Sequence, residues 1–246
     1  MKRIYLLLAF ICFACPGFCQ QPGSSGPLVQ KGSVYTGLTF NFNVKKTEGE
    51  EQLLVYIEDR KNNTFNFDLN SGYFLKDNFA LGGRLSYAQS RRVGREQDLI
   101  GIPSDISGRE QDWGIYATMK NYLPLDKNHR FYLYNMVLLG GRISNAKTES
   151  TKIGIVTTTE TKDKLIELRL VPGLMVNIVK GFCLDLGTDI AGVKSSWSNT
   201  TVNGNPTTKK SEVSADLTIN LLRLSLGFYY YFGVHNNKSK GAPARL

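Results

Sequence analysis

Cysteine and histidine are both scarce in this sequence of 246 residues, and each shortage excludes a class of protein. Three of the four cysteines lie within the first twenty residues, so Cys183 stands alone in the remainder and no disulfide framework is expected. One cysteine and two separated histidines, His129 and His235, do not give the ligand spacing of a zinc site. No metal, cofactor or prosthetic group is therefore expected.

Long hydrophobic runs are missing as well. Beyond the N-terminus, no stretch approaches the roughly 18 consecutive apolar residues that a membrane-spanning helix needs, which excludes a polytopic helical membrane protein. No segment shows an apolar stripe with a period of 3.6 residues. The charged content is modest at 21% and aromatic residues reach 11%, which argues against a disordered chain.

The N-terminus has the pattern of an export signal, residues 1–19. Two basic residues precede the apolar stretch Ile4–Ala14, which is too short to span a bilayer. Gly17 and Cys19 are small residues at the −3 and −1 positions of a cut before Gln20. Lipidation of Cys19 is the alternative, although the bulky Phe18 precedes it. In either case the protein leaves the cytoplasm, so the net charge of +9 does not indicate a nucleic-acid partner.

After a leader at residues 20–31, apolar and polar residues alternate with a period of two, the pattern of strands that have one apolar face. No helix is expected beyond the signal. Within Phe131–Ile143 the register is ambiguous, because Asn135 falls on an otherwise apolar face, and Leu221-Leu222 suggests a bulge in the last strand. Eight strands are predicted: Val34–Val44, Phe65–Leu75, Phe79–Tyr87, Trp113–Tyr122, Phe131–Ile143, Lys164–Ile178, Phe182–Lys194 and Val213–Phe232.

The connections alternate strictly between long and short. All long loops then emerge from one end of an up-and-down sheet and all tight turns from the other, as in outer-membrane β-barrels with long external loops and short periplasmic turns. The expected long loops are Lys45–Thr64, Ala88–Asp112, Ser144–Asp163 and Ser195–Glu212, and the short turns are Lys76–Asn78, Leu123–Arg130 and Val179–Gly181.

Aromatic residues gather at both ends of most strands, which predicts two belts at the membrane interfaces around a band of aliphatic residues. One belt lies toward the long loops: Phe40, Phe42, Phe65, Phe67, Tyr87, Trp113 and Trp197. The other lies toward the short turns: Tyr73, Phe74, Phe79, Tyr122, Phe131, Tyr132, Phe182 and Phe228–Phe232.

Four motifs resemble the small outer-membrane β-barrel family common in Bacteroidetes: Gly72–Gly82, Asn121–Leu125, Pro172–Leu174 and Leu226–Phe232. The similarity covers residues 32–232. It implies an all-β, eight-stranded antiparallel up-and-down transmembrane β-barrel in the outer membrane, inserted by the barrel-assembly machinery through an aromatic C-terminal strand. It does not imply an activity. Members of the family usually end at the terminal Phe, whereas here a basic polar tail at residues 233–246 follows.

Candidate catalytic residues are few, and an enzyme is not expected. Asp185 and Asp189 share one face of a strand, where pairing with an inward arginine is a simpler role than general acid–base chemistry. The glycine pairs Gly82-Gly83 and Gly140-Gly141 have no helix after them, so they are not phosphate-binding loops. They indicate positions where strands approach closely or bulky neighbours need room.

The polar faces of the strands place charged residues in the lumen of the barrel. Eight strands enclose a space that side chains alone can fill, and an unpaired buried charge is costly. Five acids and five bases therefore predict a salt-bridged plug, in which Arg84 reaches toward Asp68 or another inward acid. The expected lumen charge network consists of Asp68, Arg84, Lys120, Arg142, Glu167, Arg169, Asp185, Asp189, Asp216 and Arg223.

Two functions remain open at this stage. The first is a barrel with a plugged lumen that acts in surface binding or in envelope structure, with outer-membrane lipid, lipopolysaccharide, an envelope protein or a surface ligand as partners. The second is a narrow, porin-like channel or a conduit for small solutes. The second long loop carries arginines and acids of mixed sign, which is most simply a solvated loop, but its basic start, Arg91-Arg92, is a candidate for contact with lipid phosphates.

Overall fold

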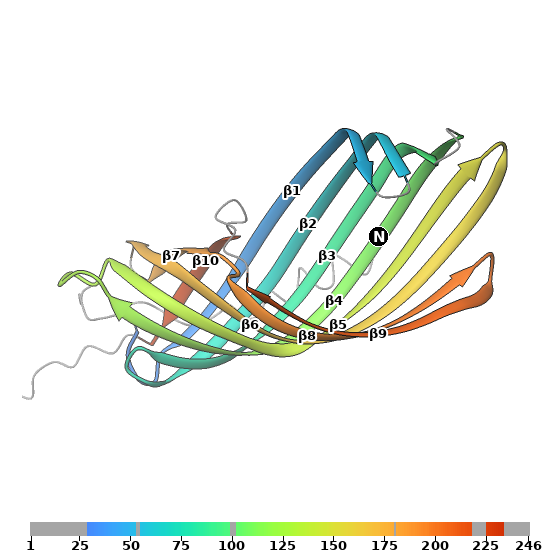
Figure 1. Ribbon diagram of the computed structural model, residues 1–246. Coiled ribbons are helices and arrows are strands. Elements are labelled where there is room, and N and C mark those ends of the chain that lie inside the picture. The colour runs from blue at the N-terminus through green and yellow to red at the C-terminus, as the bar shows by residue number, and fades with distance from the viewer. Residues whose placement is uncertain (1–28, 53–54, 99–101, 180, 218–224, 234–246) are drawn as a thin grey trace, which may run out of the picture. The chain divides into compact units, whose positions relative to one another are not determined.

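The computed structural model describes residues 29–52, 55–98, 102–179, 181–217 and 225–233. The export signal, most of the leader and the C-terminal tail lie outside these residues, which all belong to one compact unit, Pro27–Val234. Ten antiparallel strands make up the fold (Figure 1): β1 (Val34–Gln52), β2 (Val55–Lys76), β3 (Phe79–Asp98), β4 (Pro103–Pro124), β5 (Phe131–Lys152), β6 (Ile155–Val179), β7 (Phe182–Gly187), β8 (Ala191–Val202), β9 (Asn205–Leu217) and β10 (Ser225–Phe232).

Hydrogen-bonded pairing closes eight of these strands into a ring. Each of β1 to β6 pairs with the next strand along the chain. β7 then pairs with β10, and β10 pairs with β1, which closes the ring. The closing seam runs from Val34 opposite Phe232 to Phe40 opposite Leu226. The remaining two strands extend the sheet from β6, which pairs with β8, and β8 pairs with β9. The expected antiparallel up-and-down order is therefore confirmed.

The strand count differs from the expected eight, because two of the expected strands are each divided. The segment Phe182–Lys194 forms β7 and β8, and one extra residue bulges from it opposite Pro172. Proline has no N–H to donate to a ladder, so the regular pairing is interrupted there. The segment Val213–Phe232 forms β9 and β10, and the expected bulge at Leu221-Leu222 lies outside the described residues.

The long connections are also different from the expectation. They are not irregular loops but continue the strands as four long β-hairpins, formed by β1–β2, β3–β4, β5–β6 and β8–β9. The last two end in two-residue turns, Ile153-Gly154 and Asn203-Gly204, in which both residues have positive φ. This is the turn geometry that matches the twist of a hairpin, and Asn-Gly is its strongest sequence signal. We call this edge the hairpin end, and the opposite edge the short-turn end.

The two faces of the ring differ in a systematic way. Large apolar side chains point outward and are exposed on every strand of the ring, including Leu38, Leu85, Ile115 and Leu168. Alternate residues point into the ring and are buried. In β5 both faces are apolar: Tyr132, Tyr134, Met136 and Leu138 are buried, while Asn135 lies on the exposed face. This assignment resolves the ambiguous register of that strand.

The end of the leader packs against the short-turn end. Val29 is buried among the core residues, and its carbonyl accepts a hydrogen bond from the backbone N–H of Asn78. The backbone N–H of Lys31 donates to the Asp77 carboxylate at 2.8 Å. Asn78 itself has φ +62°, a conformation that asparagine tolerates in a tight turn.

No helix in the part of the chain that the structure describes is long and apolar enough to cross a membrane.

Candidate functional site

The interior of the eight-strand ring, which we call the lumen, is the candidate functional site. Tyrosines fill its short-turn half, and glycines on neighbouring strands make room for their rings. Tyr35 lies directly opposite Gly72, and Tyr229 lies opposite Gly37. A Cβ atom at Gly72 would come within 2.4 Å of the Tyr35 ring, and one at Gly37 within 2.3 Å of the Tyr229 ring. The same arrangement pairs Tyr116 with Gly140 and Tyr134 with Gly173.

These contacts agree with the interpretation of the glycine pairs in the sequence. Gly140 faces the Tyr116 ring, while a Cβ at Gly82 would lie 2.2 Å from the Ser71 carbonyl oxygen. A close approach of backbones explains both glycines, since a Cβ atom at Gly140 would also lie 2.1 Å from the Ile115 carbonyl oxygen, and Gly140 in addition makes room for a bulky neighbour. Aromatic rings that cover glycines across a strand pair also fix the register of the sheet.

A buried ion pair lies among these tyrosines. Lys120 Nζ is 2.6 Å from Asp185 Oδ2, and the two side chains are 1% and 3% exposed. The ammonium group also faces four aromatic rings, at 4.2 Å from the ring centroid of Tyr134, 4.5 Å from Tyr229, and 5.2 and 5.4 Å from Tyr122 and Tyr35. The carboxylate attracts the cation and the ring faces add cation–π attraction, so a charge that would be costly alone is held inside the ring.

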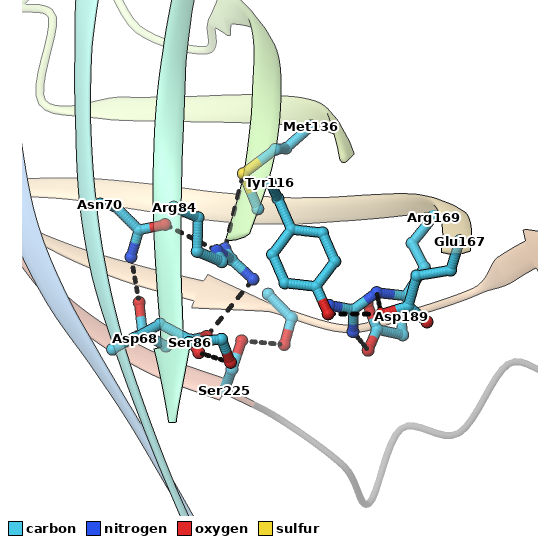
Figure 2. Close-up of polar contacts among 12 residues, drawn as sticks. Asp68, Asn70, Arg84, Ser86, Tyr116, Met136, Glu167, Arg169, Asp189 and Ser225 are labelled. Atoms are coloured by element: carbon cyan, nitrogen blue, oxygen red, sulfur yellow. Dashed lines mark hydrogen bonds and ion pairs between the residues drawn. The ribbon is translucent and has the colours of Figure 1, made fainter. Parts of the chain in front are cut away.

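A second cluster of contacts centres on Arg84, toward the hairpin end (Figure 2). Its Nη1 lies 3.3 Å from Asp68 Oδ2, and its Nε donates to Asn70 Oδ1 at 2.7 Å. Ser86 donates to the other oxygen of Asp68 at 2.6 Å. Only 8% of Arg84 is exposed. The neighbouring β2 and β3 thus supply both the cation and the groups that balance it.

A third group lies beside it, on β4, β6 and the segment between β7 and β8 (Figure 2). The Tyr116 hydroxyl donates to Glu167 Oε1 at 2.6 Å. Arg169 lies 3.4 Å from Glu167 and donates to Asp189 Oδ2 at 3.0 Å, and its guanidinium carbon is 5.3 Å from the centroid of the Tyr116 ring. Asp185 and Asp189, which share a strand face in the sequence, therefore pair with different cations.

The remaining members of the expected charge network are not all brought together. Arg142 lies 3.7 Å from Asp112, a residue that the sequence analysis assigned to a loop. The side chain of Asp216 and the whole of Arg223 lie outside the described residues. The charges that the structure describes thus form separate pairs at different depths rather than one continuous network.

Between the second and third clusters and the hairpin end, the lumen contains a cavity of about 640 Å³. Arg84, Tyr116, Glu167 and Arg169 line it, together with Arg142 and polar side chains of β1 to β4. Toward the short-turn end the space is filled by the tyrosines and the Lys120–Asp185 pair. The lumen therefore has a polar half with open space and a packed half.

The outward orientation expected of the aromatic belts is found for some residues and not for others. Outward, exposed aromatics are present toward both ends: Phe40, Phe42, Phe65, Trp113 and Trp197 at one, and Tyr73, Phe131, Phe182 and Phe228 at the other. Five aromatics assigned to the second belt instead point inward and are buried in the lumen: Phe74, Tyr122, Tyr132, Tyr229 and Tyr231. In these strands aromatic residues occupy both faces, so alternation alone does not assign them.

The inward tyrosines and three polar partners, Asn70, Ser86 and Asp112, were not predicted from the sequence. The missing signal was the position of each glycine relative to a tyrosine on the next strand. Tyr35 and Gly72 are 37 positions apart, and only the pairing register brings them together.

The described charges of the lumen form ion pairs. Among the described residues, no group of three or more histidine, cysteine or acidic side chains is arranged to hold a metal ion. His129 lies in the turn between β4 and β5, and His235 lies outside the described residues. Cys183 is a buried free thiol.

Neither a protein-family model nor any of the curated proteins matches the sequence. Among solved structures, the chain is similar to Ail, the attachment invasion locus protein of Yersinia pestis, with 17% identity over 82% of this chain and 100% of that one, and a TM-score of 0.38. It is also similar to Neisserial surface protein A, with 16% identity over 82% of this chain and 100% of that one, and a TM-score of 0.31.

Proposed function

We propose that this chain is a non-enzymatic β-barrel of the bacterial outer membrane, of the Bacteroidetes type, whose hairpins act in surface binding or in envelope structure. The observation that carries the proposal is the inverted packing of the ring: charged side chains such as Lys120, Asp185 and Arg84 are buried inside, while large apolar side chains cover the outside. Exposed apolar patches on soluble monomers rarely exceed a few hundred Å². Lipid chains can cover such an apolar surface. The closed ring gives the backbone N–H and C=O groups of its strands hydrogen-bond partners, as a lipid environment requires.

A surface role rather than transport is supported by the packed half of the lumen. Lys120, Asp185 and the surrounding tyrosines are contributed by the wall strands themselves, and they fill the space at the short-turn end. The long β-hairpins then face the outside of the cell, and the short turns face the periplasm, as in barrels of this kind. The aromatic strand β10 is the element that the barrel-assembly machinery would recognise.

Four measurements test this proposal. The mature protein is expected in the outer-membrane fraction, with a β-sheet circular dichroism spectrum in detergent and a heat-modifiable migration in gels. In planar bilayers it is expected to give no large, steady ion conductance. Recovery in the soluble fraction would refute the localisation.

A narrow channel is the alternative function, and the 640 Å³ polar cavity is the observation that favours it. In that case the Lys120–Asp185 pair would be the constriction, and Lys120→Met would change the ion selectivity of stable openings. The absence of openings in both the wild type and Lys120→Met would exclude the channel.

Processing of the export signal is a separate part of the proposal. Cleavage before Gln20 predicts a mature protein without a lipid, and intact-mass measurement checks it. A mass that includes a diacylglyceryl group on Cys19 would instead make the protein a lipoprotein.

A further inference from the structure

On the outward face of the hairpins β3–β4 and β5–β6, three basic residues lie side by side on adjacent strands. Arg91 lies opposite Arg109, and Arg109 lies opposite Lys147. Side chains directly opposite each other in an antiparallel pair have Cβ atoms only about 5 Å apart, and like charges in such positions repel each other. We call Arg91, Arg109 and Lys147 the basic row.

Two cations on these hairpins, Arg95 and Lys147, form ion pairs, whereas Arg91 and Arg109 form none among the described residues. Four residues beyond Arg91, on the same face, Arg95 lies opposite Asp105, and their side chains form an ion pair at 2.8 Å. Lys147 Nζ lies 3.0 Å from Glu149. Arg91 and Arg109 have no ion-pair or hydrogen-bond partner in the described part of the chain, and both are exposed. The sheet therefore holds two like charges together with nothing of opposite sign between them.

The basic row lies just beyond the apolar band of the ring. The outward pair Tyr87 and Trp113, with ring centroids 4.6 Å apart, marks the hairpin-side limit of the outward aromatics on β3 and β4. Arg109 is four residues beyond Trp113 on the same face, which is about 13 Å along the strand and less along the membrane normal because barrel strands are tilted. Lys162 on β6 is also exposed and outward. It lies opposite Asn145, which in turn lies opposite Gln111, so its level along the strands is between that of Arg109 and that of Trp113.

These residues line an outward-facing groove. The cations Arg91, Arg109, Lys147 and Lys162 surround the amide side chains of Gln111 and Asn145. Glu149 and Glu160 are its two acids, so basic residues predominate. Guanidinium and ammonium groups bind phosphate, and amides between them offer hydrogen bonds of the kind that sugar hydroxyls accept and donate.

We propose that this groove binds the phosphorylated sugar head group of a glycolipid in the outer leaflet, of the lipid A class. The proposal rests on the outer-membrane location proposed above, which places the groove at the level of the head groups. The spread of cations over more than one level of the sheet suits a disaccharide that carries a phosphate at each end better than a phospholipid with one phosphodiester. Phosphate oxygens between Arg91 and Arg109 would replace the repulsion of these two side chains with charge-assisted hydrogen bonds.

The test is lipid binding by the full-length mature protein, folded in a neutral detergent and followed by native mass spectrometry. The probes are bis-phosphorylated lipid A, the same lipid A without phosphates, and phosphatidylglycerol. The wild type should bind the bis-phosphorylated form most tightly, and the affinity should fall as salt is raised. R91Q/R109Q should lose about tenfold in this affinity, because two phosphate contacts are removed. The matched control R95Q, on the same face of β3, should bind as the wild type does.

Three outcomes would overturn the assignment. Equal binding of lipid A with and without phosphates would refute a phosphate site, and equal binding of phosphatidylglycerol would replace the glycolipid with any anionic lipid. The third is a loss of stability of R91Q/R109Q without lipid. Removal of two repelling charges should leave the lipid-free protein at least as stable as the wild type, so such a loss would indicate a structural role. Because lipid binding is measured in detergent, its failure is distinct from failure of the cell-fractionation test.

Discussion

Replacement of Lys120 by methionine is expected to destabilise the folded protein by about 3–5 kcal/mol, the usual cost of breaking a buried ion pair by removing one partner. The ammonium group lies 2.6 Å from Asp185 Oδ2, and both side chains are almost completely buried. In Lys120→Met, the carboxylate stays inside the lumen without its cation. Its other oxygen, Oδ1, is already without a hydrogen-bond partner among the described residues, so nothing replaces the lost contact.

The opposite substitution should cost less. In Asp185→Leu, the Lys120 ammonium keeps the faces of four tyrosine rings, the nearest at 4.2 Å from the centroid of Tyr134. Cation–π contacts contribute roughly 0.5–2 kcal/mol each when they are shielded from water. The double variant Lys120→Met/Asp185→Leu leaves no charge behind and should lie within about 1 kcal/mol of the wild type or exceed its stability.

The assay is urea-induced unfolding of the three variants in lipid vesicles, followed by tryptophan fluorescence. The expected order of stability places the double variant near the wild type, Asp185→Leu below it and Lys120→Met lowest. A loss of under about 1 kcal/mol in Lys120→Met, or a double variant as unstable as the single ones, would show that the pair does not carry buried charge and would refute the reasoning.

Other substitutions test other parts of the structure. Arg84→Ala should cost about 3–5 kcal/mol in the same unfolding assay because it leaves Asp68, which is only 16% exposed, without its cation inside the lumen. The exposed Arg92→Ala should cost about 0–1 kcal/mol. Gly72→Val should cost about 1–3 kcal/mol through a clash with the tyrosine ring opposite, and replacement of that tyrosine by Leu in the same chain should recover stability. A hydrogen bond from the backbone N–H of Phe131 holds the pKa of Asp126 below its ordinary range. The wild type should therefore be more stable to unfolding than Asp126→Ala at neutral pH, and this difference in the free energy of unfolding should disappear as the pH falls through the lowered pKa. An equal difference at pH 7 and at strongly acidic pH would contradict this.

The alternation of residues predicted most of the ring strands and the face on which Asp68 and Arg84 meet, because a strand with one polar and one apolar face has only one sensible orientation. Where both faces are apolar, as in β5, the same rule gave no answer, and the burial of Tyr132 rather than Phe131 depends on packing across the lumen. Where both faces are polar, as in the parts of the long hairpins beyond the ring, which we call the hairpin arms, the rule detected no strand. Asn203-Gly204 was the available signal for one of these hairpins.

The lumen charges illustrate a second limit. Which residues face inward follows from one strand at a time, but which cation meets which acid depends on residues far apart in the chain. Lys120 and Asp185 are 65 positions apart on strands that are not neighbours in the ring, and they meet across its interior. The sequence shows no local pattern for such a pair, nor for the tyrosines that surround it.

The continuity of the hairpin arms with the wall strands restricts how the chain can change in length. In a β-hairpin, deletion of a single residue below the tip shifts the register by one and exchanges the inward and outward side chains of everything beyond it. In the β5–β6 arm such a deletion would turn Lys147 toward the interior and its neighbour Ala146 outward. Insertions at the tips, for example of a peptide tag at Ile153-Gly154, leave the faces intact. Variation in these arms is therefore expected in steps of two residues along their length, and without such a restriction at their tips.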